Sequence, residues 1–141
     1  MKKKIVILAV IITGILFPMA SISKYSSIYS AVFSQMFRSL GAHIFLHSVL
    51  FIALGMCLIG IFPNQTTWKL ALLILVVNLL MAVGQESFQA LSINSLRVSD
   101  TLFDLGVDTT ATLGLIAALI LYRRWQKSAQ EIKPHRRIPL K

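Results

Sequence analysis

Four apolar segments constrain this chain more than any other feature of its sequence. They are Ile5 to Ala20, His47 to Phe62, Leu70 to Val83 and Leu102 to Tyr122. The middle two reach the length that spans a bilayer, about 20 residues, when their semi-polar flanks are added. Backbone polar groups in lipid must be satisfied internally, which only helices and closed barrels achieve. We therefore expect an all-α membrane protein, a bundle of four transmembrane helices at residues 5–20, 43–62, 68–85 and 102–122.

The composition agrees with an integral membrane domain. Hydrophobic residues make up 56% of the chain, above the 45–50% of a typical soluble domain. Residues 1–122 are expected to form one transmembrane domain. Cys57 is the only cysteine, so it can form no intrachain disulfide, and we expect it to serve in packing.

The placement of the basic residues predicts the orientation in the membrane. The net charge is +9, which in a soluble protein would suggest nucleic acid. If all four segments span, however, eleven basic residues fall on one side and only Lys24, Arg38 and Arg97 on the other. Basic residues concentrate on the cytoplasmic side of membrane proteins. We expect no nucleic-acid partner and both termini in the cytoplasm.

Two segments outside the spans have their own expected roles. Residues 21–42 place apolar side chains at helical period among serines, which predicts a helix lying in the outer membrane interface. This helix is expected either to connect two membrane spans or to cover a binding site as a lid. Residues 123–141 are basic and contain Pro134 and Pro139. They are expected to form a disordered cytoplasmic tail that is attracted to anionic lipid.

Residues 86–114 hold four of the five acidic residues. Asp100, Asp104 and Asp108 follow one another at intervals of four and so share roughly one helix face. Asp108 lies one turn deeper than Asp104, and because desolvation disfavours a carboxylate we expect it to act mainly through hydrogen bonds. Asn78, Glu86 and Gln89 form a polar stripe that runs toward the outer end of the preceding helix.

His43 and His47 are also four apart and share a face near the outer surface. That spacing suits a metal pair, but no HExxH motif surrounds it. We therefore expect the histidines to act as hydrogen-bond or charge partners, and we predict no metal site.

These polar groups are expected to meet near the outer leaflet, although they come from three helices and a loop. An aspartate at the centre of a membrane helix costs roughly 2.5–3.5 kcal/mol, so Asp104 and Asp108 should face the bundle interior beside Arg97 or a histidine. Interhelical hydrogen bonds return only about 0.6 kcal/mol each, which favours a functional site over a purely structural cluster. The predicted polar pocket comprises His43, His47, Glu86, Gln89, Arg97, Asp100, Asp104 and Asp108.

Short motifs in this region resemble the VanZ-like family of small multi-pass proteins, named for a teicoplanin-resistance accessory protein. The segment HSVLFIALG from His47, the ESFQ segment, Arg97 with Asp104, and Gly114 match the family pattern in order and spacing. Asp108 stands where that family usually has asparagine. The resemblance implies a cytoplasmic-membrane protein that is in some cases linked to reduced susceptibility to lipoglycopeptides.

Three functions remain open from the sequence. The first is binding of, or action on, an envelope component such as a lipid-linked precursor, a lipid headgroup or a lipoglycopeptide. Glu86 and Asp104 are then the candidate acid and base, oriented by Arg97 and His47, although no nucleophile motif such as GxSxG is present. The second is a proton- or cation-coupled transport element. The third is a structural or assembly protein. Membrane lipid is the expected partner, and the sequence defines neither a cofactor nor the oligomeric state.

Overall fold

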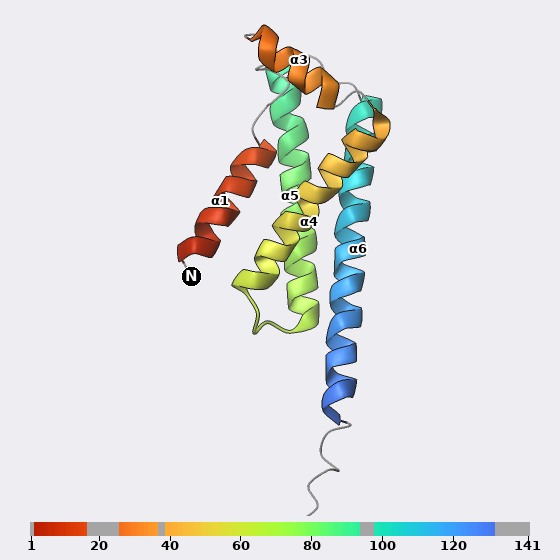
Figure 1. Cartoon of the computed structure of the whole chain (residues 1–141). Coiled ribbons are helices and arrows are strands. Elements are labelled where there is room, and N and C mark those ends of the chain that lie inside the picture. Colours follow the sequence, from red (N-terminus) through yellow and green to blue (C-terminus); the bar gives the residue numbers. More distant parts are fainter. Residues whose placement is uncertain (1, 17–25, 37–38, 94–97, 132–141) are drawn as a thin grey trace, which may run out of the picture.

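The computed structural model describes residues 2–16, 26–36, 39–93 and 98–131, and within these ranges the regular secondary structure is α-helix, with a turn at residues 62–66. The helices are α1 (Lys2–Leu16), α3 (Ser27–Met36), α4 (Leu40–Ile61), α5 (Thr67–Ile93) and α6 (Val98–Glu131). Figure 1 shows α4, α5 and α6 as the long elements of the molecule, with α1 against one side.

Three of these helices are long and apolar enough to cross a membrane. The candidate spans are Leu40–Ile61, Thr67–Leu91 and Val98–Gln130, with mean hydropathies of 2.5, 2.0 and 1.7. The prediction of an all-helical membrane protein is confirmed at this level. The helices α5 and α6 extend beyond the predicted spans, because hydropathy locates an apolar stretch whereas a helix also continues through polar turns that lack proline and glycine.

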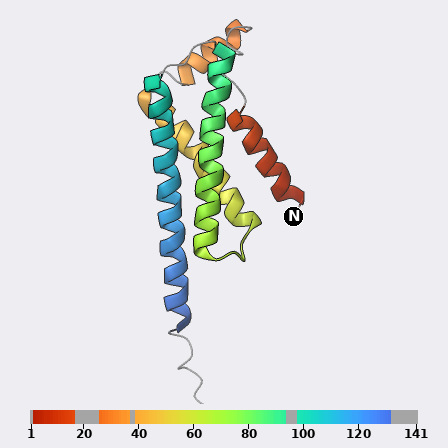
Figure 2. The ribbon, with the colours of Figure 1, turned by 180° about the vertical axis from the view of Figure 1, so that it is seen from behind.

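The first predicted span is only partly covered by the structure. Helix α1 has 15 residues, or about 22 Å at 1.5 Å per residue, which is shorter than a bilayer core of about 30 Å. Residues 17–20 lie outside the described part of the chain. Lys4 Nζ donates to Gly60 O at the end of α4 (2.6 Å), and the tip of Leu16 lies near Gly84 on α5. Helix α1 therefore runs antiparallel to α4 and in the same direction as α5 (Figures 1 and 2).

The start and end of α4 follow from local sequence. Ser39 caps the helix by accepting a hydrogen bond from Ala42 N (3.1 Å), which satisfies one of the free N–H groups of the first turn. Pro63 follows Phe62, and a residue before proline is disfavoured in the helical conformation. Residues 40–42, predicted as part of the interfacial segment, consequently belong to α4.

Helix α3 lies across the end of the bundle where α4 and α6 begin (Figures 1 and 2). It occupies part of the segment in which an interfacial helix was predicted. Ile28 and Val32 are exposed on it, as an interfacial helix requires.

The buried apolar side chains form two clusters between the helices. One contains Ile15, Phe51, Leu54 and Ala82, and the other contains Leu58, Leu70, Ile74 and Leu119. Gly55 allows α4 to approach its neighbours closely, because a Cβ at this position would overlap the Leu115 side chain and lie 3.2 Å from Ile74 Cγ2. Many large apolar side chains elsewhere are exposed, as expected for helices that face lipid.

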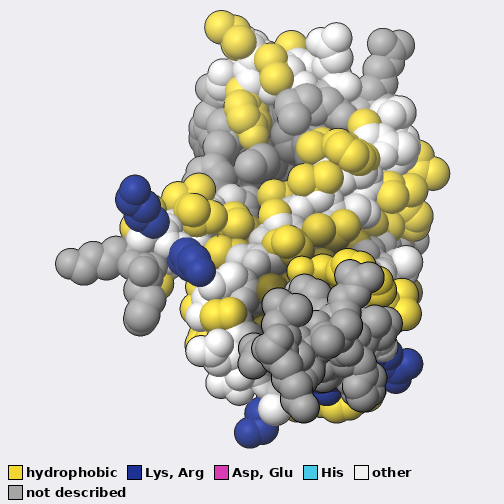
Figure 3. Space-filling model, turned by 60° about the horizontal axis from the view of Figure 1, so that its bottom comes forward, with side chains coloured by type: hydrophobic (Ala, Val, Ile, Leu, Met, Phe, Trp, Pro, Cys, Tyr) yellow, Lys and Arg dark blue, Asp and Glu magenta, His cyan; other side chains and the backbone are white. Residues whose placement is uncertain are grey.

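The opposite end of the bundle carries basic side chains. Figure 3 shows this end, with Lys and Arg around its edge and apolar side chains over much of the remaining surface. Arg123 joins α6 to the α4–α5 turn by donating to Gln65 O (2.6 Å) and Pro63 O (3.2 Å). Helix α6 continues to Glu131, which corrects the expectation of a disordered tail from residue 123. The segment RRWQKSAQE lacks helix breakers and contains several strong helix formers.

Candidate functional site

The candidate site is formed by two histidines of α4 and two aspartates of α6. His43 and His47 lie one turn apart on the same face of α4, and their rings stack with centroids 4.5 Å apart. Asp104 and Asp108 lie one turn apart on α6. We refer to these four residues as the His–Asp cluster.

Each histidine is bonded to one aspartate. His43 Nε2 donates to Asp104 Oδ1 at 2.6 Å, and His47 Nδ1 donates to Asp108 Oδ1 at 2.9 Å. The sequence separation is 61 residues in both pairs, so α4 and α6 run in the same direction here and remain in step over one turn. The two pairs form successive rungs between the helices.

Burial distinguishes the two rungs. The side chains of His47 and Asp108 are 8% and 4% exposed, whereas the side chains of His43 and Asp104 are 27% and 9% exposed. Buried charged groups are tolerated only when they are paired and hydrogen-bonded. The prediction that Asp104 and Asp108 face the interior beside a donor is therefore confirmed, with histidine as the donor in both cases. The His43–Asp104 rung is the one that an outside molecule can reach.

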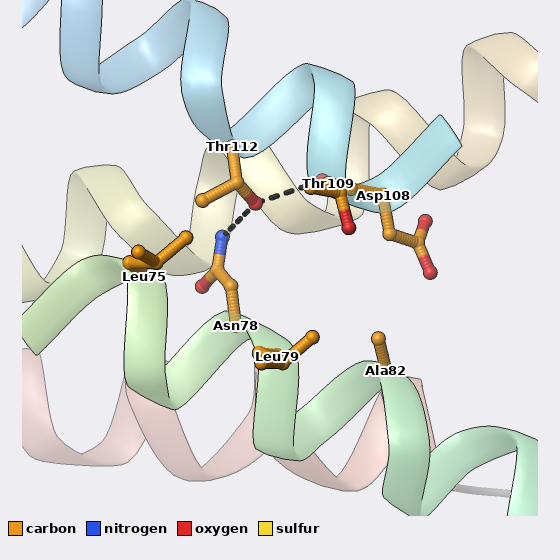
Figure 4. A pocket seen from close by; sticks show the side chains of 7 residues that line it. All are labelled: Leu75, Asn78, Leu79, Ala82, Asp108, Thr109 and Thr112. Atoms are coloured by element: carbon orange, nitrogen blue, oxygen red, sulfur yellow. Dashed lines mark hydrogen bonds between the residues drawn. The ribbon is translucent and has the colours of Figure 1, made fainter. Parts of the chain in front are cut away.

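A second polar network continues from the cluster into the bundle. Thr112 Oγ1 donates to Asp108 O (2.8 Å), and Asn78 Nδ2 donates to Thr112 Oγ1 (2.8 Å) and to Phe51 O (3.1 Å). Figure 4 shows Asn78 of α5 pointing toward Thr112 of α6, around a small pocket with about 200 Å³ of empty volume. These bonds connect α4, α5 and α6 at one level.

Sequence reasoning noted Asn78 but missed Thr112. A signal for Thr112 was present, because it continues the four-residue spacing of Asp100, Asp104 and Asp108. Threonine is common in membrane helices, so a single threonine does not by itself indicate a site. Its pairing with Asn78 depends on how α5 and α6 pack, which spacing within one helix does not reveal.

Glu86 approaches the cluster from α5. Its Oε1 atom is buried and has no hydrogen-bond partner, and its charge acts on the His47 imidazole. An unpaired buried carboxylate oxygen is costly and is a common feature of binding sites. Gln89, one turn further along α5, is half-buried.

Asp100 and Arg97 are the other two residues of the predicted pocket. Asp100 is exposed in the first turn of α6, where it accepts a hydrogen bond from Ser99 Oγ (3.1 Å). Its acidic side chain also suits the positive end of the helix dipole. Arg97 lies outside the described residues, so its predicted role as a partner of the aspartates remains a prediction.

An apolar groove runs along α4 and α6 beside the cluster. It has about 1030 Å³ of empty volume, including space open to the surroundings. Its lining includes Ile44, Ser48 and Ile52 of α4 and Phe103, Gly106 and Gly114 of α6. It begins near His43, whose ring centroid lies 6.3 Å from that of Phe103. We call this feature the α4–α6 groove.

Comparison of the chain with models of known protein families, with curated proteins and with solved structures gives no match. The VanZ-like resemblance therefore rests on the short motifs alone. Three of these lie at the site: His47 is in the cluster, Asp104 forms the accessible rung, and Glu86 carries the unpaired oxygen.

Proposed function

We propose that the chain is a VanZ-like multi-pass protein of the bacterial cytoplasmic membrane that binds a lipid-linked component of the cell envelope. The polar headgroup contacts the His–Asp cluster and the hydrocarbon chain lies in the α4–α6 groove. The observation that carries this proposal is that the two features are neighbours between the same pair of helices: the ring of Phe103, which lines the groove, lies 6.3 Å from the ring of His43.

The groove suits a hydrocarbon chain of a membrane lipid. Its lining on α6 extends from Leu102 to Leu115, which is about 20 Å at 1.5 Å per residue. It lies between helices that are apolar enough to cross a membrane. A lipid chain is the apolar group that such a surface meets at highest concentration.

The cluster suits a polar headgroup that forms hydrogen bonds. The His43–Asp104 rung is partly exposed, and the Glu86 oxygen lacks a hydrogen-bond partner, so the site has a polar surface that a ligand can reach and an acceptor that remains unpaired. Histidine exchanges protons readily near neutral pH, and carboxylates serve as general acids or bases in enzyme sites. Asp104 and Glu86 are the candidate acid and base if binding is followed by a reaction.

The distribution of charge supports an outward-facing site with both termini in the cytoplasm. Lys4, Lys69 and Arg123 lie at or beside the end of the bundle opposite the cluster, and the positive-inside rule assigns such an end to the cytoplasm. Helix α1 runs from that end toward the cluster and packs on α4 and α5 through Ile15 and Leu8. In this proposal α1 belongs to a fourth membrane span, the one predicted at residues 5–20.

The bundle gives less support to a transport role. Below the level of Asn78 and Thr112, the interior is closed by the apolar cluster of Leu58, Leu70, Ile74 and Leu119. A proton or ion relay needs polar groups or water across the whole membrane. In the described residues the hydrogen-bonded polar network stops half-way.

The test is lipid that stays bound to the purified protein. The full chain is extracted in a mild detergent, and bound lipid per chain is quantified by mass spectrometry. We expect the wild type to retain one lipid class at a defined ratio. Asp104→Asn should lose selectivity for the headgroup, and Gly114→Phe should reduce total retention by filling the groove, since nothing lies within 4 Å of a Cβ at Gly114.

The control is Gly60→Phe, which adds the same bulk on α4 at a position away from the groove where a Cβ also meets nothing within 4 Å. A lipid profile that is the same for the wild type, Asp104→Asn and Gly114→Phe would contradict the proposal. In a deletion strain we further expect altered envelope lipids or altered teicoplanin susceptibility, restored by the wild-type gene.

A further inference from the structure

Three side chains of the site offer ligand atoms that lie close together. His43, His47 and Asp104 can each present one such atom, and these atoms all lie within 4.8 Å of one another. The sequence alone favoured hydrogen-bonding roles, because two histidines without a third ligand are weak grounds for a metal site. The structure supplies the third group from a different helix.

We propose that His43, His47 and Asp104 bind a divalent transition-metal ion of the zinc type. Two imidazoles and one carboxylate form a ligand set that zinc enzymes use, with a fourth position left for water or substrate. The two histidines at positions i and i+4 of α4 present their rings on one side. This inference goes beyond the proposed lipid function and does not depend on it.

Asp108 supplies the outer partner that such a site needs. Metal-bound histidines nearly always donate their other ring N–H to a carboxylate or a carbonyl, which fixes the ring and leaves the ligating nitrogen free. His47 Nδ1 donates to Asp108 Oδ1, so in the neutral imidazole the lone pair is on Nε2. Asp108 thereby acts as a positioning residue and not as a ligand.

The His43–Asp104 rung adapts to the ion with a small movement. The present separation of 2.6 Å is shorter than that between two ligands of a tetrahedral zinc ion, about 3.3 Å for bonds of about 2.0–2.1 Å. A displacement of less than about 1 Å opens the space. A nitrogen that ligates a metal carries no proton, so metal binding at His43 releases the proton from its ligating nitrogen.

The local charge also favours a cation. Asp104, Asp108 and Glu86 bring three carboxyl groups around two imidazoles, and the charges of all three act on His47. Glu86 Oε1 is buried without a hydrogen-bond partner. It is an acceptor that a metal-bound water could use.

Metal binding is tested with the ion alone. The full chain in detergent, carrying Cys57→Ala to remove its thiol, is stripped with a chelator and reloaded with Zn²⁺ or Co²⁺. We expect one ion per chain by elemental analysis, the visible absorption of tetrahedral Co²⁺, and a rise in melting temperature on adding Zn²⁺. His43→Ala and Asp104→Asn should each abolish stoichiometric binding and the Co²⁺ spectrum.

Two further variants define the site. Asp108→Asn should bind roughly 10–100-fold more weakly while keeping the stoichiometry, as expected of an outer partner. Asp100→Asn removes the same charge from an exposed position of the same helix and should bind as the parent does. The inference is overturned if the parent binds no stoichiometric ion, or if His43→Ala, monodisperse in detergent, binds as tightly as the parent. Neither result bears on whether lipid is retained, so the two proposals fail separately.

Discussion

His47 Nδ1 donates to Asp108 Oδ1 across 2.9 Å, and both side chains are almost completely buried between α4 and α6. A bond of this kind holds two helices in one register, because neither partner has another way to satisfy its polar atoms in an apolar bundle. It also places the adjacent His43–Asp104 rung at the accessible end of the cluster.

Asp108 should tolerate asparagine far better than leucine. Asparagine retains an oxygen that accepts from His47 Nδ1, whereas leucine leaves that buried donor unpaired, at a cost of about 1–3 kcal/mol. We expect Asp108→Leu to lower the melting temperature and the abundance in the membrane well below the values of Asp108→Asn. Thermal unfolding in detergent and immunoblots of membranes measure both. Equal losses for the two variants would mean that the bond to His47 contributes little to stability.

The spacing within each helix was sufficient to predict which residues share a face. Asp104 and Asp108 were predicted to point inward, and His43 and His47 were predicted to lie together, because a four-residue step depends only on helix geometry. That His43 pairs with Asp104 and His47 with Asp108 could not be predicted from this spacing. The register between α4 and α6 depends on packing between distant residues, such as Gly55 against Leu115.

The helix ends were predicted less well for a similar reason. Hydropathy measures transfer to lipid, so it ended the last span at Tyr122, where the basic residues begin. The helix itself ends at Glu131, because hydrogen bonds within the helix and anchoring of Arg123 to the α4–α5 turn do not require apolar side chains. In the same way, Asp100 shares the spacing of the other aspartates but lies in the first turn of α6, beyond the buried part of the interface.

The Asn78–Thr112 hydrogen bond should contribute modestly to stability. Polar pairs in membrane bundles average about 0.6 kcal/mol and reach about 1.7 kcal/mol. In a double-mutant cycle of Asn78→Leu and Thr112→Val, we expect a coupling free energy within that range, measured by reversible unfolding in mixed micelles. Thr112→Ser, which keeps the hydroxyl group, is the matched control and should retain the coupling. Strict additivity of the two changes would show that the 2.8 Å contact is energetically neutral.

Gly55 should be sensitive to added bulk, unlike Gly60 on the same helix. A Cβ at Gly55 would overlap the Leu115 side chain and come within 3.2 Å of Ile74 Cγ2, whereas a Cβ at Gly60 meets nothing within 4 Å. Overpacking typically costs about 1–3 kcal/mol, so Gly55→Val should destabilise the bundle by that amount. Gly60→Ala should be neutral or stabilising by up to about 1 kcal/mol, because alanine favours helix. Thermal unfolding of the two variants in the same detergent makes the comparison.

The two ends of α6 should be accessible from opposite sides of the membrane. Ser99 and Ser128 are both exposed and lie near the first and last turns of this helix. In a Cys57→Ala background, Ser99→Cys should react with a membrane-impermeant thiol reagent in intact cells, and Ser128→Cys should react only after lysis. Any outer membrane is permeabilised first. The reverse pattern would place the His–Asp cluster on the cytoplasmic side.

Asp104→Asn should separate function from folding. Asparagine keeps an oxygen that accepts from His43 Nε2 and occupies nearly the same volume, and the Asp104 side chain is 9% exposed, so the bundle should assemble normally. It removes the negative charge at the accessible rung, which both the lipid and the metal proposals require. We therefore expect normal abundance by immunoblot together with failure to complement a deletion strain, while Asp100→Asn complements fully. If abundance and complementation instead fall in proportion for Asp104→Asn, the cluster acts only to hold the helices together, because a purely structural bond affects activity through the amount of folded protein and in no other way.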